Sequence, residues 1–187
     1  MLRFLTSSKA PVLLLAFVIA TFAANVKAQK SSLGQVDFPT SGSEKAQAHF
    51  LRGVAALHSF WYEEAREEFV ASTKTEPDFM MGYWGEAMTY NYPLWAEVQQ
   101  TAAARKALEK VADSKKLTAR ERAYLNAVKV LYGEGDKSAR DKAYAVAMEK
   151  VYRDYPEDLE AACFYAQREL VVKDCNGLIL CFGEDTR

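Results

Sequence analysis

The residues of this 187-residue chain best suited to chemistry include its two histidines, His49 and His58. They lie nine positions apart, which on a helix is about 900° of rotation, so they point to opposite faces and cannot bind one metal ion together. His58 could instead join Glu86 and Asn91 in a metal or acid–base site, because imidazole and carboxylate groups bind metals and transfer protons. The standard catalytic and phosphate-binding motifs are missing from the sequence, so no catalytic residue, resident metal or cofactor is predicted.

The three cysteines all lie late in the chain. Cys163 falls within a helical pattern and is predicted to be a small buried residue. Cys175 and Cys181 flank Asn176-Gly177, a strong turn dipeptide, so a disulfide across a short hairpin is geometrically allowed. Free thiols are the alternative, and the sequence leaves this choice open.

Charge is balanced along the chain, with 24 basic and 25 acidic residues. That balance argues against a nucleic-acid partner, which requires a strongly basic surface. The acidic run Glu63-Glu64 and Glu67-Glu68 surrounds Arg66, and we expect it to form a solvated outer helix face.

The first 28 residues have the form of a secretory signal peptide. Arg3 and Lys9 precede the apolar run 11–24, and the small residue Ala28 favours cleavage between Ala28 and Gln29. Fourteen apolar residues span only about 21 Å as a helix, less than the hydrocarbon core of a bilayer, so no stable membrane insertion is expected after cleavage. A secreted or exported protein is predicted, with an uncleaved anchor or a mitochondrial presequence as alternatives.

Beyond the signal, the pattern predicts an all-α protein. Residues 29–43 are expected to be a leader segment outside the helical domain, which spans 44–171, and residues 172–187 a non-repeat tail. Ser43, Thr118 and Asp136 are predicted N-caps, and Pro156 is predicted at the first position of the last helix. The expected helices cover about 44–58, 62–75, 78–91, 96–112, 118–133, 136–154 and 156–170.

Pairs of helices suggest a 34-residue repeat, and one such repeat begins at Ala46. Its landmark residues are Gly53 at position 8, Tyr62 at 17, Ala65 at 20, Phe69 at 24 and Pro77 at 32, and the next unit adds Ala87 and Tyr90. Small residues at the helix crossing and a large one between successive hairpins are what such packing needs. This pattern resembles the tetratricopeptide family, strongly over 46–79, moderately to 112 and weakly beyond. The resemblance implies antiparallel helix pairs stacked as a short right-handed solenoid, with an irregular tail.

That resemblance also implies a concave groove for a peptide or protein partner. The residues expected to line it are Phe50, Val54, Leu57, His58, Met81, Trp84, Met88, Asn91 and Tyr92. Two other interpretations stay open: these side chains pack between helices, or His58, Glu86 and Asn91 form a metal-binding or hydrolytic site on the same scaffold. Because the last helix lacks a partner and the tail is apolar, a structural fragment of a longer repeat protein is a further alternative.

Overall fold

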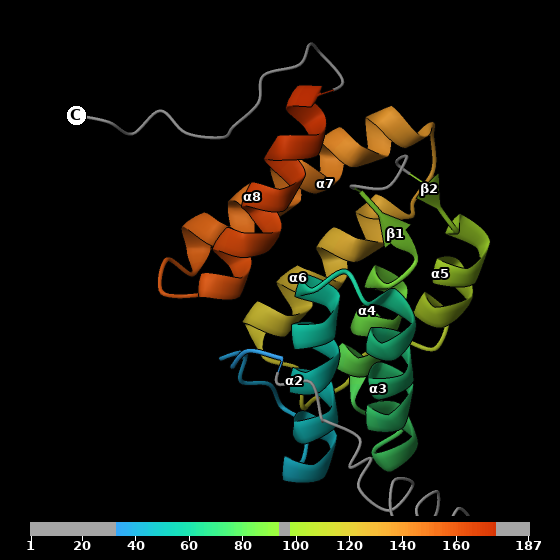
Figure 1. Ribbon diagram of the computed structural model, residues 1–187, viewed down its shortest axis with the longest axis vertical. Coiled ribbons are helices and arrows are strands. Elements are labelled where there is room, and N and C mark those ends of the chain that lie inside the picture. The colour runs from blue at the N-terminus through green and yellow to red at the C-terminus, as the bar shows by residue number, and fades with distance from the viewer. Residues whose placement is uncertain (1–32, 94–97, 175–187) are drawn as a thin grey trace, which may run out of the picture. The chain divides into compact units, whose positions relative to one another are not determined.

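The computed structural model describes residues 33–93 and 98–174, and in these ranges the chain forms helices and one short pair of strands (Figure 1). The predicted all-α class is confirmed. The strands β1 (Asn91–Tyr92) and β2 (Val98–Gln99) pair antiparallel, with Asn91 opposite Gln99. The helices are α2 (Glu44–His58), α3 (Tyr62–Thr75), α4 (Met80–Met88), α5 (Thr101–Leu108), α6 (Ala119–Leu131), α7 (Lys137–Asp154) and α8 (Leu159–Asp174).

Several predictions fall on parts of the chain outside these ranges. They are the signal peptide with its cleavage between Ala28 and Gln29, the first residues of the leader, and the pairing of Cys175 with Cys181. Among helices in the described ranges, none combines the length and the apolar composition needed to cross a bilayer.

The predicted N-caps are confirmed at three helices. The side chain of Ser43 accepts a hydrogen bond from the Ala46 amide at the start of α2, and Asp136 does the same for α7. Thr118 forms a reciprocal capping box with Glu121 at the start of α6. Each cap satisfies amide groups that the first turn of a helix leaves without an intrahelical acceptor, which is why the sequence fixes these starts well.

The region between α4 and α5 differs from the prediction. Helices were expected over 78–91 and 96–112, but α4 and α5 are shorter, and the residues between them include the paired strands β1 and β2. Pro93 cannot donate to a helical ladder, so the helix ends before it, and Asn91 and Tyr92 pair with Gln99 and Val98 instead.

The last helix also differs at both ends. The first residue of α8 is Leu159, rather than the predicted Pro156, and Asp158 caps the helix, because its Oδ1 accepts from the amides of Glu160 and Ala161. The helix continues to Asp174, so the predicted boundary at 171/172 falls inside it.

Consecutive helices pack against one another in the pairs α2–α3, α3–α4, α4–α5, α6–α7 and α7–α8. In addition, α4 contacts both α2 and α6, so alternate helices share one side (Figure 1). We call this side, with the face of α8 that carries Phe164, the inner face. It carries the largest buried side chains, which include Phe50, Trp84 and Tyr124.

Phe69 on α3 fixes the junction between the first helix pair and α4. Its side chain is fully buried. A Cβ atom added to Gly53 on α2 would lie 2.7 Å from the Phe69 ring, and one added to Gly85 on α4 would lie closer still. The expectation that Gly53 provides room and that Phe69 fills the gap between hairpins is confirmed. The sequence did not single out Gly85, which serves the same ring from the other side.

Candidate functional site

The predicted groove is filled in the folded chain. Of the nine residues expected to line it, only His58 and Tyr92 keep intermediate exposure. The other seven are buried, namely Phe50, Val54, Leu57, Met81, Trp84, Met88 and Asn91. The prediction of an open groove lined by these side chains is therefore corrected. They belong to the hydrophobic core, because other parts of the same chain cover them.

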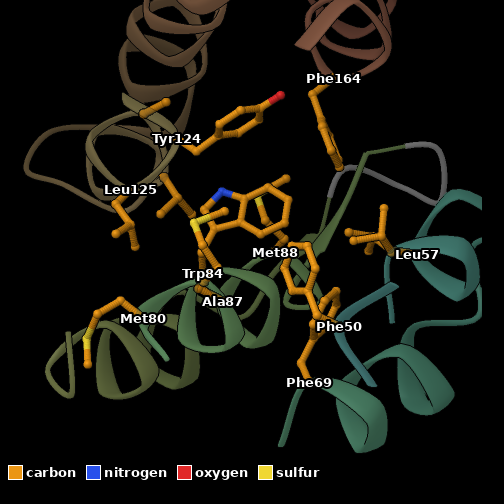
Figure 2. Packing of buried hydrophobic residues seen from close by; sticks show 14 of the residues in the cluster. Phe50, Leu57, Phe69, Met80, Trp84, Ala87, Met88, Tyr124, Leu125 and Phe164 are labelled. Carbon is orange, nitrogen blue, oxygen red and sulfur yellow. The ribbon is translucent and has the colours of Figure 1, made fainter. Parts of the chain in front are cut away.

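Trp84 lies at the centre of this core, with rings from α2, α3, α6 and α8 around it (Figure 2). Its ring centroid is 6.0 Å from that of Phe50 on α2, 5.6 Å from Tyr124 on α6 and 5.3 Å from Phe164 on α8. The last two contacts are edge-to-face, a geometry that aromatic pairs favour. Thus rings from α6 and α8 of the same chain pack on the side chains that were expected to contact a partner.

A second cover comes from residues 33–42, which we call the strap. The sequence placed these residues in a leader outside the domain, and that prediction is wrong for the strap. Phe38 is 0% exposed, and its ring centroid lies 5.2 Å from Phe50, 5.7 Å from Trp84 and 4.9 Å from Tyr124. The guanidinium of Arg120 stacks over the same ring at 4.5 Å, which adds a cation–π contact. We call Phe50, Trp84, Tyr124 and Arg120 the Phe38 cage.

Polar side chains hold the strap by its main chain. The Gln47 amide donates to the Phe38 carbonyl at 2.8 Å, and Arg120 Nη1 donates to the Pro39 carbonyl at 2.8 Å. Glu121 Oε1 accepts from both the amide and the hydroxyl of Ser41, at 2.7 and 2.9 Å. Among the described residues, no backbone–backbone hydrogen bond links 33–42 to a helix. The strap is therefore held by the Phe38 ring, by the partly buried side chains of Leu33 and Val36, which also pack against the core, and by a few side-chain hydrogen bonds.

Arg120 itself is fixed by α8. Its Nε lies 2.5 Å from Asp158 Oδ2, and the Tyr124 hydroxyl donates to the same oxygen at 2.8 Å. Although burial alone would raise the pKa of Asp158, the hydrogen bonds from Arg120 and Tyr124 hold this pKa below its ordinary value. Burial, and next the negative charge of Asp158, raise the pKa of Tyr124. Arg120, Tyr124 and Asp158 are therefore bonded to one another, and together they connect the strap, α6 and α8.

A surface hollow of about 440 Å³ opens beside this cluster. It is bounded by the strap at Asp37 and Pro39, by Arg120 and by the α7–α8 connection 154–159. Leu159 forms part of its wall and is 72% exposed. Sequence reasoning missed this hollow because no motif marks a site shared by three distant segments.

His58, Glu86 and Asn91, the alternative metal or acid–base set, each have a different partner. His58 Nε2 lies 2.6 Å from Glu160 Oε2, and the His58 ring also contacts Phe164. Glu86 pairs with Lys110 at 3.5 Å, and Asn91 Oδ1 accepts from Gln99. Over the described ranges, no group of three His, Cys, Asp or Glu side chains is placed to hold a metal ion.

Only a slit remains at the rim of the predicted groove. It has a volume of about 10 Å³ and lies among Leu57, Met88, Asn91 and Phe164. Tyr92 does not face it from the inner side: its ring packs on Tyr62, and its hydroxyl accepts from Arg66 of α3. Tyr62 lines the slit with a buried hydroxyl that has no hydrogen-bond partner in the described part of the chain, and burial raises its pKa to about 12.

Other predicted residues fall as follows. Ala65 and Ala87 are fully buried as the repeat pattern requires, Tyr90 is half-buried under Arg66, and Pro77 follows the end of α3. Cys163 is an exposed free thiol, so its predicted burial is wrong. The neighbouring positions Ala161 and Phe164 take the inward side of α8, which turns position 163 outward.

One sequence feature could have indicated the strap. Phe38-Pro39 is an aromatic–proline pair inside a polar, Ser- and Gly-rich stretch, and a large aromatic residue there needs a reason. The pairing of this segment with Arg120 and Glu121 could not be foreseen, because hydrogen bonds over about eighty positions leave no local pattern.

A scan against protein-family models, a search of curated proteins and a search of solved structures each gave no match for this chain.

Proposed function

We propose that this chain is an exported, non-catalytic scaffold of the tetratricopeptide type, which binds a peptide or protein partner on its inner face. The observation that carries the proposal is the packing at Phe69. This ring lies between Gly53 of one helix pair and Gly85 of the next helix, at the junction where the tetratricopeptide resemblance places a large residue against small ones. The succession of helix contacts, with α4 touching both α2 and α6, supports the same arrangement.

The charged groups of the inner face favour a scaffold over a catalyst. Each pair connects two elements: His58 on α2 with Glu160 on α8, and Arg120 on α6 with Asp158 at the start of α8. Polar side chains used in this way hold helices in place. Although Arg120 and Asp158 also line the surface hollow, each oxygen of Asp158 already accepts two hydrogen bonds within the chain, which leaves this carboxylate without a free acceptor for a substrate.

The hollow beside the strap is where we place the partner's approach. It combines an exposed aliphatic side chain, Leu159, with the acidic side chains of Asp37, Asp154 and Glu157 at its wall. An apolar contact surrounded by polar groups is the usual form of a peptide-binding surface. We therefore expect the partner to carry apolar and basic side chains at this point.

Two matched variants test this surface. Leu159 and Val146 are both exposed aliphatic residues, at 72% and 66%, but only Leu159 belongs to the hollow. Proteins cross-linked to the exported wild-type chain are identified by mass spectrometry, and the yield of each is then measured for Leu159→Asp and Val146→Asp. A partner lost at least about tenfold in Leu159→Asp and retained in Val146→Asp is expected for a hot-spot side chain. Equal yields in both variants, or no specific cross-link at all, would contradict the proposed function.

A further inference from the structure

The seat of Phe38 is built like a recognition site. Three rings from three different helices, Phe50, Trp84 and Tyr124, enclose the Phe38 ring at centroid distances of 4.9 to 5.7 Å. Arg120 covers the ring at 4.5 Å. A preorganised aromatic pocket that buries one ring completely is the kind of anchor point that dominates peptide binding.

The strap enters this seat in the manner of a bound peptide. Among residues 33–42 only Phe38 is buried, and the residues on either side of it, Asp37 and Pro39, are exposed. The remaining contacts go largely to main-chain atoms: the carbonyls of Phe38 and Pro39 accept from Gln47 and Arg120, and the Ser41 amide donates to Glu121. Such contacts recognise an extended backbone and one fully buried ring, and the partly buried Leu33 and Val36 and the Ser41 hydroxyl add to them.

Proline after the anchor suits this arrangement. Its fixed φ and its effect on the preceding residue keep both residues extended. Pro39 uses only its carbonyl, which Arg120 binds, and the missing N–H of proline leaves no donor without an acceptor. Gly42 then lets the segment pass over Phe79, because a Cβ at this position would lie 2.7 Å from the Phe79 ring.

From these contacts we infer that the Phe38 cage is a peptide-binding site which the strap occupies in cis, and that its partner is an extended segment in which an aromatic residue precedes proline. This inference deepens the proposed function and rests on it, since it names the ligand class of the inner face. A strap joined directly to α2 acts at a high effective concentration, on the order of millimolar. A free peptide therefore binds the wild-type chain weakly until the strap is displaced.

The test uses the full chain and a fluorescent peptide with the sequence of residues 33–43. We measure its anisotropy with wild-type protein and with Phe38→Ala, whose own strap lacks the anchor ring. Phe38→Ala should bind the peptide at least about tenfold more tightly than the wild type does, because the competitor in cis is gone. A peptide that carries alanine in place of its phenylalanine is the matched control and should bind neither protein.

A folded Phe38→Ala protein that binds the peptide no better than wild type overturns the inference. If Phe38→Ala does not fold, amide exchange in the wild type decides. The Ser41 amide should exchange at least about tenfold faster than core amides of α6 such as Val128, because the strap opens without global unfolding. Equal exchange rates would make the strap an inseparable part of the core and overturn the inference.

A dimer of wild-type protein that the peptide dissociates would assign the cage to the strap of a second copy, and would overturn the inference that the strap occupies it in cis. The peptide assay needs no natural partner. A negative result therefore leaves partner binding at the Leu159 surface standing, and loss of that binding leaves the peptide result unaffected.

Discussion

Phe38 and Phe69 are both fully buried, and both contact the rings of Phe50 and Trp84. Their attachment differs. Phe69 lies within the helix α3 and is enclosed by Gly53 and Gly85, so its position follows from the packing of two helices. Phe38 lies on a strap without helical hydrogen bonds and is held by its ring and by Gln47, Arg120 and Glu121. Equal burial therefore does not mean an equal role. Phe69 fixes how α2, α3 and α4 pack, whereas Phe38 covers the inner face.

The largest effect is expected from Phe69→Ala. Removing a buried ring whose surroundings are fixed helix backbones leaves a cavity that cannot collapse, so the free energy of unfolding should fall by about 3–5 kcal/mol. Urea denaturation measures this loss. Val146→Ala, at a 66% exposed position, serves as control and should change stability by less than about 0.5 kcal/mol. A loss below about 1 kcal/mol for Phe69→Ala would mean that the junction does not hold the array together.

Phe38→Ala should cost less, about 2–3 kcal/mol, because the strap can lift away and the site can relax. Its effect should also be local. Amide exchange should increase at the strap and in the first turn of α6, where Glu121 binds Ser41, and should stay nearly unchanged in α3. Faster exchange throughout α2, α3 and α4 would remove the distinction between the two phenylalanines.

Asp158→Asn should act on the strap side, since asparagine can still cap α8 while the charge that fixes Arg120, and thereby the cover over Phe38, is lost. We expect a loss of about 2 kcal/mol near neutral pH, as for a hydrogen bond to a charged group. The pKa of Asp158 is lowered in the folded state, so its stabilisation is present above the ordinary aspartate pKa of 3.8 and is lost as pH falls through the folded value.

The stability difference between wild type and Asp158→Asn should therefore narrow below about pH 4, measured by urea denaturation at several pH values. Tyr124→Phe removes a neutral hydroxyl from the same oxygen and provides the comparison, with a smaller loss at neutral pH. A difference that stays constant or widens on acidification would contradict the assigned role of Asp158.

Gly85→Ala should have the smallest effect, about 1–2 kcal/mol of destabilisation. Alanine gains up to about 1 kcal/mol of helix propensity over glycine, but its Cβ would overlap the Phe69 ring and force it to move. Gly34→Ala on the strap is the matched control, because no atom lies within 4 Å of a Cβ built there. Thermal unfolding of both variants makes the comparison, and a Gly85→Ala protein as stable as wild type would show that this junction has spare room.

Most of the local structure could be predicted because its causes are local. Ser43, Thr118 and Asp136 cap the helices where expected, since each needs only an amide three residues ahead. The failure between α4 and α5 also has a local cause, in that Pro93 interrupts the helical pattern, and Asn91 and Tyr92 pair with Gln99 and Val98. The residues of the candidate site were harder to predict, because the sequence pattern at Trp84 and Phe50 is compatible both with the wall of a groove and with a buried core.

The sequence by itself determined the helical class, the helix caps and the close approach at Phe69, where small and large residues recur at fixed spacing. Only the tertiary structure decided what covers Trp84. Rings from α6 and α8 and the strap residue Phe38 reach it from segments that are far apart along the chain. The physical reason is that an apolar helix face must be buried, but its composition does not specify which apolar side chain buries it.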